Sequence, residues 1–260
     1  MSYTLIDTHA HAYDPDLTAI YGEWTERASN NQLSKILLPN IDIESIAQMY
    51  ELVDKDPTRC VPMMGLHPCS VKANYEDVLS QIKGELYSKK YPFCAVGEIG
   101  LDYHWDTTFI EEQKSAFKMQ IEWAIDLNIP IAVHTRKSLD EAIHIIKTYR
   151  TQKLKGVIHC FGGSLQQANQ IIDLGFYMGI GGVITYKNAG LAEIVKDIDL
   201  KHLVLETDAP YLTPVPHRGK LNEPSYVKYV AEKIAEIKGL SLEEVAAQTT
   251  ENARNLFSIY

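Results

Sequence analysis

Residues 3–11 read YTLIDTHAH, a short apolar run that ends in an aspartate and two histidines. Seven further short apolar runs follow along the chain, and longer amphipathic segments separate them. The runs are rich in Val, Ile, Leu and Cys, as is typical of strands buried on both faces of a parallel sheet. We predict strands at residues 3–6, 35–39, 60–65, 93–96, 129–133, 156–158, 176–180 and 203–205.

The segments between these strands have helical periodicity. In residues 109–127, side chains of one face recur at three- and four-residue steps. Ser164 and Ser241 each begin a pattern typical of a helix capping box. The last two helices are predicted at residues 224–238 and 242–257, with apolar stripes that we expect to pack against the barrel wall. The alternation predicts the α/β class, as a single (β/α)8 TIM-type barrel with an additional C-terminal helix.

Length and charge set further limits. The chain has 260 residues and a formal net charge of -9. No Pro-, Gly- or Ser-rich linker divides it, so we expect one domain over residues 1–260. No apolar run approaches the roughly 18 residues of a membrane span, and residues 1–7 lack the pattern of a signal peptide, so we expect a cytoplasmic protein. The negative charge argues against a broad surface for duplex nucleic acid.

The four cysteines are scattered and form no C-x-x-C pair; they are Cys60, Cys69, Cys94 and Cys160. This spacing disfavours both a disulfide framework and a cysteine zinc site. Cys160 follows His159 directly. Because adjacent side chains of a strand point to opposite faces, we expect Cys160 to be a small buried apolar residue and not a ligand.

Five of the eight predicted strands lead into side chains that bind metal ions. These are His9 and His11 after the first strand, Glu98 after the fourth, His134 after the fifth, His159 after the sixth and Asp208 after the eighth. Because the strands of a (β/α) barrel all point the same way, these side chains are expected to gather at one rim. Imidazole and carboxylate ligands suit zinc, manganese, nickel, iron or cobalt. Six ligands exceed the needs of one tetrahedral ion, so we predict two divalent ions with Glu98 as the bridge.

At these residues the chain resembles the TatD family of metal-dependent deoxyribonucleases, a branch of the amidohydrolase-like metal hydrolases. The motifs that carry the resemblance run the whole length: DTHAH at 7–11, GLHP at 65–68, VGEIGLDY at 96–103, IAVHTR at 131–136, HCFGGS at 159–164, LETDAPYL at 205–212 and RGKLNEP at 218–224. The resemblance implies two ligand groups joined by Glu98, with His9, His11 and Asp208 in one and His134 and His159 in the other. It also implies that His67 faces the substrate phosphate.

These observations together predict a metal-dependent deoxyribonuclease. We expect an exonuclease on single-stranded or short DNA that uses a water activated by two divalent ions, of zinc, manganese, magnesium, nickel or cobalt. Glu98 and Asp208 are the candidate catalytic residues, with Asp208 as general base. Asp7 and Glu206 lie beside ligands in the sequence and are predicted to orient the imidazoles. We expect no membrane and no obligatory protein partner.

Substrate contacts are predicted in the rim loops. Arg136 and Arg218 are candidates because arginine suits phosphate; the alternative is that they form a solvated basic surface with Lys137 and Lys220. Two tyrosines that follow ligand motifs, Tyr103 and Tyr211, either stack on a base or pack in the pocket wall.

Two other functions stay open. One is an amidohydrolase-type carbonyl hydrolase for amides or lactones on the same scaffold, since activated water attacks a carbonyl as well as a phosphoryl group. Many such enzymes carry a modified lysine at the fourth strand, where this chain has Glu98. The other is a non-catalytic protein that keeps metal ions for stability.

Overall fold

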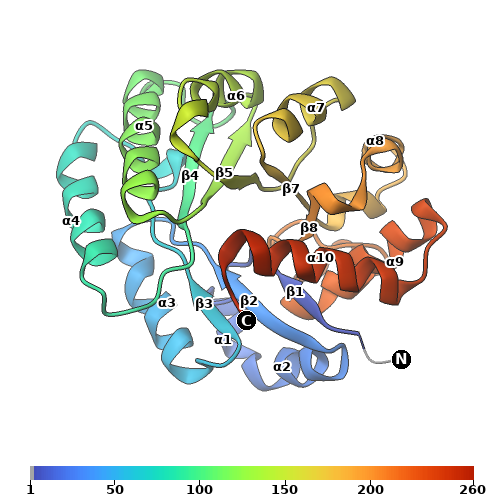
Figure 1. Ribbon diagram of the computed structural model, residues 1–260. Coiled ribbons are helices and arrows are strands. Elements are labelled where there is room, and N and C mark those ends of the chain that lie inside the picture. The colour runs from blue at the N-terminus through green and yellow to red at the C-terminus, as the bar shows by residue number, and fades with distance from the viewer. Residues whose placement is uncertain (1–2) are drawn as a thin grey trace.

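Eight parallel strands alternate with helices along the chain, and the helices lie outside the strands (Figure 1). In this computed structural model, which describes residues 3–260, the strands are β1 (Leu5–Asp7), β2 (Leu33–Leu38), β3 (Cys60–Pro62), β4 (Val96–Asp102), β5 (Ile131–Arg136), β6 (Gly156–Ile158), β7 (Tyr177–Ile180) and β8 (Leu203–Leu205). Every predicted strand overlaps one of these. Residues 1 and 2 lie outside the described residues, and they belong to the segment on which we based the expectation of a cytoplasmic protein.

Helices separate the strands along the chain, and residues 224–226 of the helix predicted at 224–238 form a 3-10 helix instead. The helices are α1 (Pro15–Ala19), α2 (Tyr21–Asn30), α3 (Ile43–Lys55), α4 (Tyr75–Tyr87), α5 (Ile110–Leu127), α6 (Leu139–Lys147), α7 (Leu165–Asp173), α8 (Leu191–Asp197), α9 (Val227–Lys238) and α10 (Leu242–Phe257), with short 3-10 helices η1 (Pro68–Ser70), η2 (Arg150–Gln152), η3 (Gly182–Thr185), η4 (Leu200–His202) and η5 (Pro224–Tyr226). Ser164 and Ser241 complete capping boxes at α7 and α10, which confirms both predicted starts. Among the described residues, no helix is both long and apolar enough to cross a membrane.

The strands form two hydrogen-bonded ladders, β1-β2-β3 and β4-β5-β6-β7-β8. An isolated bridge between Met64 and Val96 joins the first ladder to the second. On the other side, the amide of Thr8 donates to the carbonyl of Leu205 at 2.9 Å, between the ends of β1 and β8. The eight strands therefore follow one another round a (β/α)8 barrel, as predicted.

Strand β4 differs most from its prediction. It begins at Val96, where the predicted strand ends, so Glu98 lies within the strand instead of after it. The register against β5 also shifts between Val96 and Ile99. Two glycines and a glutamate interrupt the apolar pattern of β4. A prediction based on continuous apolar runs therefore places the strand before its observed position in the chain.

Helix α10 covers the end of the barrel at which the strands begin. Thr250 and Asn252 donate hydrogen bonds to the carbonyls of Thr4 and Leu203, at the starts of β1 and β8. The end of α10 belongs to a buried cluster with side chains of the strands: Ala253, Leu256 and Phe257 with Ile6, Leu37, Ala132, Val157 and Val204. We predicted that the apolar stripe of α10 packs against the barrel wall, whereas these residues pack across the end of the barrel. The candidate site lies at the opposite end of the barrel, where the strands end.

Candidate metal centre

A buried carboxylate lies at the middle of the site. Glu98 is 2% exposed, and its two oxygens face different histidines. Oε2 lies 3.1 Å from Nε2 of His9 and 3.4 Å from Nε2 of His11. Oε1 lies 2.9 Å from Nδ1 of His134 and 2.8 Å from Nε2 of His159. One carboxylate therefore joins two pairs of imidazoles that come from three separate strand ends.

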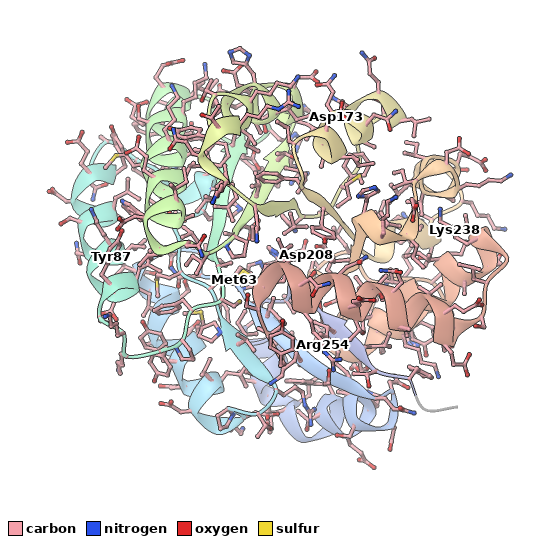
Figure 2. The ribbon with its side chains drawn as sticks, viewed as in Figure 1. Met63, Tyr87, Asp173, Asp208, Lys238 and Arg254 are labelled. Carbon is pink, nitrogen blue, oxygen red and sulfur yellow. The ribbon has the colours of Figure 1, made fainter. Side chains whose placement is uncertain are left out.

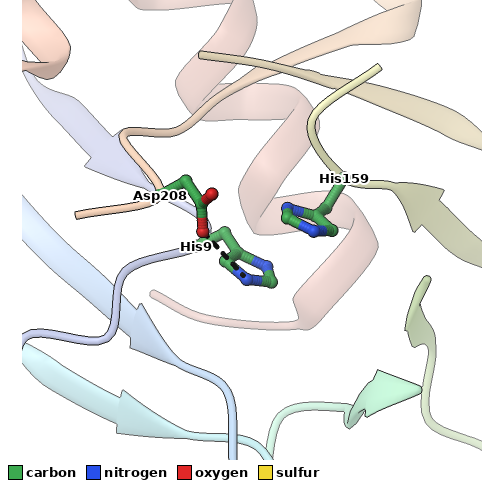
Figure 3. Close-up of side chains that lie close together, drawn as sticks. All are labelled: His9, His159 and Asp208. Carbon is green, nitrogen blue, oxygen red and sulfur yellow. Dashed lines mark ion pairs between the residues drawn. The ribbon is translucent and has the colours of Figure 1, made fainter. Parts of the chain in front are cut away.

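Asp208 lies beside the pair His9 and His11. Its Oδ1 is 3.8 Å from Nε2 of His9 and 3.7 Å from Nε2 of His11. The rings of His9 and His159 stack with their centroids 3.8 Å apart, so the two groups of histidines are in contact (Figure 3). Asp208 lies toward the middle of the ring of strands, whereas Tyr87, the last residue of α4, lies at the outside (Figure 2).

Asp7 holds the two loops that carry His9 and Asp208. Its Oδ1 accepts hydrogen bonds from the amides of His9 at 3.2 Å and Thr207 at 3.0 Å, and its Oδ2 accepts one from the Thr207 hydroxyl at 2.6 Å. Burial raises the pKa of Asp7 well above its usual range, although these hydrogen bonds act against the shift. Asp7 thus positions backbone instead of the imidazole rings that we predicted it to orient.

Glu206 lies next to His159. Its Oε1 accepts a hydrogen bond from the amide of Cys160 at 2.6 Å and lies 3.6 Å from Nδ1 of His159. The space for this carboxylate depends on Gly179 in β7, where a Cβ atom would lie 2.1 Å from Oε2 of Glu206. From this position Glu206 can orient the ring of His159, which is the role predicted for it.

Burial and charge act against each other at these residues. Burial lowers the pKa values of His9 and His67. Burial also disfavours the charged form of His159, but the attraction of Glu98 and the nearby carboxylate of Glu206 outweigh it and raise the pKa of His159 well above its usual value. Burial opposes the ionised form of Glu98 too, yet the neighbouring histidines, His159 first, keep its pKa well below the usual range. The site is a buried anion surrounded by imidazoles, which a divalent cation suits.

The donor set fits divalent metal ions. The structure has three groups of residues whose ligand atoms lie within 4.8 Å of one another inside each group. They are His9, His11 and Glu98; His9, His159 and Asp208; and His67, Glu98 and His134. Because Glu98 and His9 each belong to two groups, the groups adjoin. The buried Nδ1 atoms of His9 and His159 have no hydrogen-bond partner in the described part of the chain. Nitrogen and carboxylate ligands of this kind suit transition metals or zinc.

Asp102 also belongs to the site, although we did not predict it. Its Oδ2 lies 2.9 Å from Nε2 of His134, and its Oδ1 accepts hydrogen bonds from the amides of His104 and Trp105. Burial opposes the charge of Asp102, but these hydrogen bonds, with His134 first, lower its pKa from the usual value. Glu98 and Asp102 lie four residues apart on β4, so alternation places them on one face. That spacing would have indicated Asp102 had the strand been predicted with its observed bounds.

His67 lies among the ligand atoms. Its Nε2 is 3.3 Å from Nδ1 of His134 and 3.5 Å from Oε1 of Glu98. Its Nδ1 accepts a hydrogen bond from the amide of Cys69 at 3.1 Å, which fixes the ring. This position is compatible with metal contact as well as with the phosphate contact that we predicted.

A cleft of about 740 Å³ opens over the site. Its lining includes Glu98 and Asp208 together with the partly or largely exposed side chains of Trp105, Arg136 and Tyr211. Of the two arginines predicted to contact phosphate, Arg136 therefore lines the cleft. The other, Arg218, is outside the lining, and its guanidinium lies 4.4 Å from the ring centroid of Tyr186.

The tyrosines and lysines of the rim loops also differ in position. Tyr211 lines the cleft and is 54% exposed. Tyr103 and Lys137 instead line a neighbouring hollow, and the hydroxyl of Tyr103 is buried. Lys220 lines neither cavity.

Cys160 differs from expectation. Strand β6 ends at Ile158, so Cys160 lies in the following loop, with a left-handed φ of 47°. Its side chain is partly exposed and lines the cleft. Our prediction of a buried residue was wrong because strand alternation does not extend beyond the end of the strand. All four cysteines are free, as predicted.

Comparison with known proteins shows which family has this arrangement. The sequence profile of the family described as "TatD related DNase" matches residues 6–258. The chain belongs to the TatD family. It is 41% identical over 260 residues to the "Uncharacterized metal-dependent hydrolase YabD" of Bacillus subtilis, covering 98% of this chain and 99% of that protein. It is 32% identical to the "Uncharacterized metal-dependent hydrolase YcfH" of Escherichia coli K12, covering 98% and 96%.

Solved structures agree with this membership. The TatD homolog YjjV of Escherichia coli K12 matches with a TM-score of 0.92 and 29% identity over 98% of each chain. A phosphotriesterase homology protein of Escherichia coli, at 14% identity and a TM-score of 0.71 over 98% of each chain, shares the fold. This TatD protein is thus a metal-dependent hydrolase with an amidohydrolase-like barrel.

Proposed function

We propose that this TatD-family hydrolase is a deoxyribonuclease, and that it acts as an exonuclease on single-stranded or short DNA. The observation that carries the proposal is the position of Glu98, whose two oxygens face two groups of imidazoles at the base of an open cleft. The description of the family as a DNase supports the choice of substrate. We also propose that residues 1–260 form one domain.

The proposed ligands form two groups. His9, His11 and Asp208 lie on the Oε2 side of Glu98, and His134 and His159 lie on the Oε1 side. Divalent ions held by the two groups, of zinc, manganese, magnesium, nickel or cobalt, would polarise a phosphodiester and activate a water for attack. Glu98 would contact both groups with separate oxygens, and Glu206 would keep the ring of His159 in place.

Asp208 is the proposed general base. Its side chain is 15% exposed, so it reaches the cleft while remaining next to His9 and His11. Its amide donates a hydrogen bond to the carbonyl of His9 at 2.9 Å, which fixes the backbone that carries the carboxylate. In this position Asp208 would accept the proton of the attacking water, and His67 and Arg136 would bind phosphate oxygens.

The charges around the cleft support a short or single-stranded substrate. In the described part of the chain, Arg136 is the one lysine or arginine that lines the cleft. The formal net charge of the chain is -9. Proteins that bind along a DNA duplex contact its phosphates with many basic side chains, and the lining of this cleft has few of them.

A nuclease assay tests the proposal. Metal-free protein is reconstituted with each candidate ion and incubated with single strands labelled at the 5′ or the 3′ end. Nitrophenyl phosphodiesters, lactones and amides are tested beside them. We expect phosphodiester hydrolysis and a ladder that starts from one end of the strand. Turnover of lactones or amides alone would favour the carbonyl hydrolase instead, and no turnover of any ester would favour the non-catalytic protein.

A further inference from the structure

Trp105 is a large apolar side chain left exposed at the edge of the cleft. It is 69% exposed, whereas the other two tryptophans, Trp24 and Trp123, are 0% and 5% exposed. An indole that only stabilises the fold is buried, as those two are, because burial of an aromatic ring is strongly favourable. The exposure of Trp105 therefore requires another explanation.

The loop that carries Trp105 is held in place. The amide of Trp105 donates a hydrogen bond to Oδ1 of Asp102 at 3.1 Å, and Oδ2 of the same carboxylate lies 2.9 Å from the ring of His134. Asp106, the next residue, accepts a hydrogen bond from the amide of Thr108 and pairs with Lys72 at 3.0 Å. Trp105 is thus fixed relative to a proposed metal ligand, and its exposure is a property of this ordered loop.

A cation accompanies the indole. The guanidinium carbon of Arg136 lies 5.0 Å from the centroid of the Trp105 ring, and both residues line the cleft. Tyr211 and Leu212, on the loop after β8, are 54% and 37% exposed and line the same cleft. The proposed metal ligands therefore lie at the bottom of the cleft, and one arginine and exposed aromatic side chains line it as well.

We propose that Trp105 stacks on an unpaired nucleobase adjacent to the scissile phosphate, while Arg136 binds that nucleotide's phosphate. The inference rests on the proposed function and names its substrate as single-stranded nucleic acid, since a base within a duplex cannot present its face to the indole. Base–aromatic stacking tolerates all sequences, because each base has a π-face. Trp105 is therefore a binding residue that selects strand state and not sequence.

The test uses the full-length chain with Asp208→Asn, which is expected to slow turnover, and follows tryptophan fluorescence within the first seconds after mixing. The probes are a thymidine hexanucleotide and a strand of the same length with abasic sugars. Because Trp24 and Trp123 are buried, a change in fluorescence reports Trp105. We expect quenching by the thymidine strand and none by the abasic strand, and no quenching after Trp105→Phe. Trp105→Ala should bind the thymidine strand about tenfold more weakly, in line with the loss of one stacked base.

Tyr260→Ala is the matched control. Tyr260 is 85% exposed and lines a hollow beside the end of α10, at the other end of the barrel, so its loss should leave binding of the thymidine strand unchanged. Equal affinity for thymidine and abasic strands, or no quenching by a strand that the wild-type enzyme hydrolyses, would overturn the stacking role but leave the nuclease proposal intact. Quenching by thymidine strands without hydrolysis by the wild-type enzyme would have the opposite meaning: the stacking surface stands and the proposed function fails.

Discussion

Asp102 and Glu98 hold the ring of His134 from its two nitrogens. Oδ2 of Asp102 lies 2.9 Å from Nε2, and Oε1 of Glu98 lies 2.9 Å from Nδ1. A ligand histidine whose second nitrogen contacts a carboxylate has a fixed orientation and a more basic donor atom. Because Asp102 also binds the amides of His104 and Trp105, this carboxylate links a proposed metal ligand to the loop at the edge of the cleft.

Asp102→Asn is expected to weaken metal binding by roughly 10- to 100-fold, since an amide is a poorer partner for the imidazole than a carboxylate. Calorimetric titration of the metal-free protein measures this affinity. Asp106→Asn is the control, because Asp106 lies on the same loop and pairs with Lys72 instead of a histidine. Equal affinities of the two variants would show that Asp102 does not support His134.

Asp208→Asn is expected to lower kcat by a factor of 100 or more, because the amide cannot accept the proton of the attacking water. The fold should survive, since the side chain of Asp208 is partly exposed and the backbone amide of residue 208 keeps its hydrogen bond to the carbonyl of His9. Steady-state kinetics and a thermal melt are measured on the same sample. Full activity in this variant would remove Asp208 from the mechanism.

Metal binding is expected to release protons. His159 has a raised pKa in the metal-free protein because Glu98 and Glu206 outweigh the effect of burial, so it keeps its proton to a higher pH than a free histidine does. An entering ion has to displace that proton, and metal affinity should therefore rise with pH until His159 is neutral without metal. Calorimetry in two buffers of different ionisation enthalpy measures the released protons. Affinity and heat that do not change with pH or buffer would contradict this assignment.

Gly179→Ala is expected to displace Glu206. The added Cβ would lie 2.1 Å from Oε2 of Glu206 and 3.1 Å from Cα of His159. We expect the free energy of unfolding to fall by about 1–3 kcal/mol, as for other overpacked cores, and metal affinity to fall with it. Gly84→Ala is the matched control, since no atom lies within 4 Å of the added carbon and the site is helical. Denaturant unfolding should show the control to be as stable as the wild type or more so.

The sequence predicts the elements of this fold best where a single signal decides them. Strands β6 and β8 have their predicted bounds because each is an uninterrupted apolar run. Helix α10 has its predicted bounds because Ser241 provides a capping box. The strand predicted at 93–96 ends where β4 begins because glycines break the apolar pattern of β4, and the prediction therefore does not include Asp102.

For the site, topology explains which predictions were possible. Parallel strands bring their carboxyl ends together, so the gathering of His9, Glu98 and His159 could be inferred from their places after apolar runs. Positions in the longer loops could not be inferred in this way. The exposure of Trp105 and the contact of Arg218 with Tyr186 depend on how each loop folds back, which no periodicity encodes.

The most direct test of the account is to locate the ions. Crystals of the protein grown with zinc are measured at energies on both sides of the zinc absorption edge. We predict two anomalous peaks, one beside His9, His11 and Asp208 and the other beside His134 and His159, with Glu98 between them. A single peak, or peaks away from Glu98, would contradict the two-ion site on which the proposed hydrolysis depends.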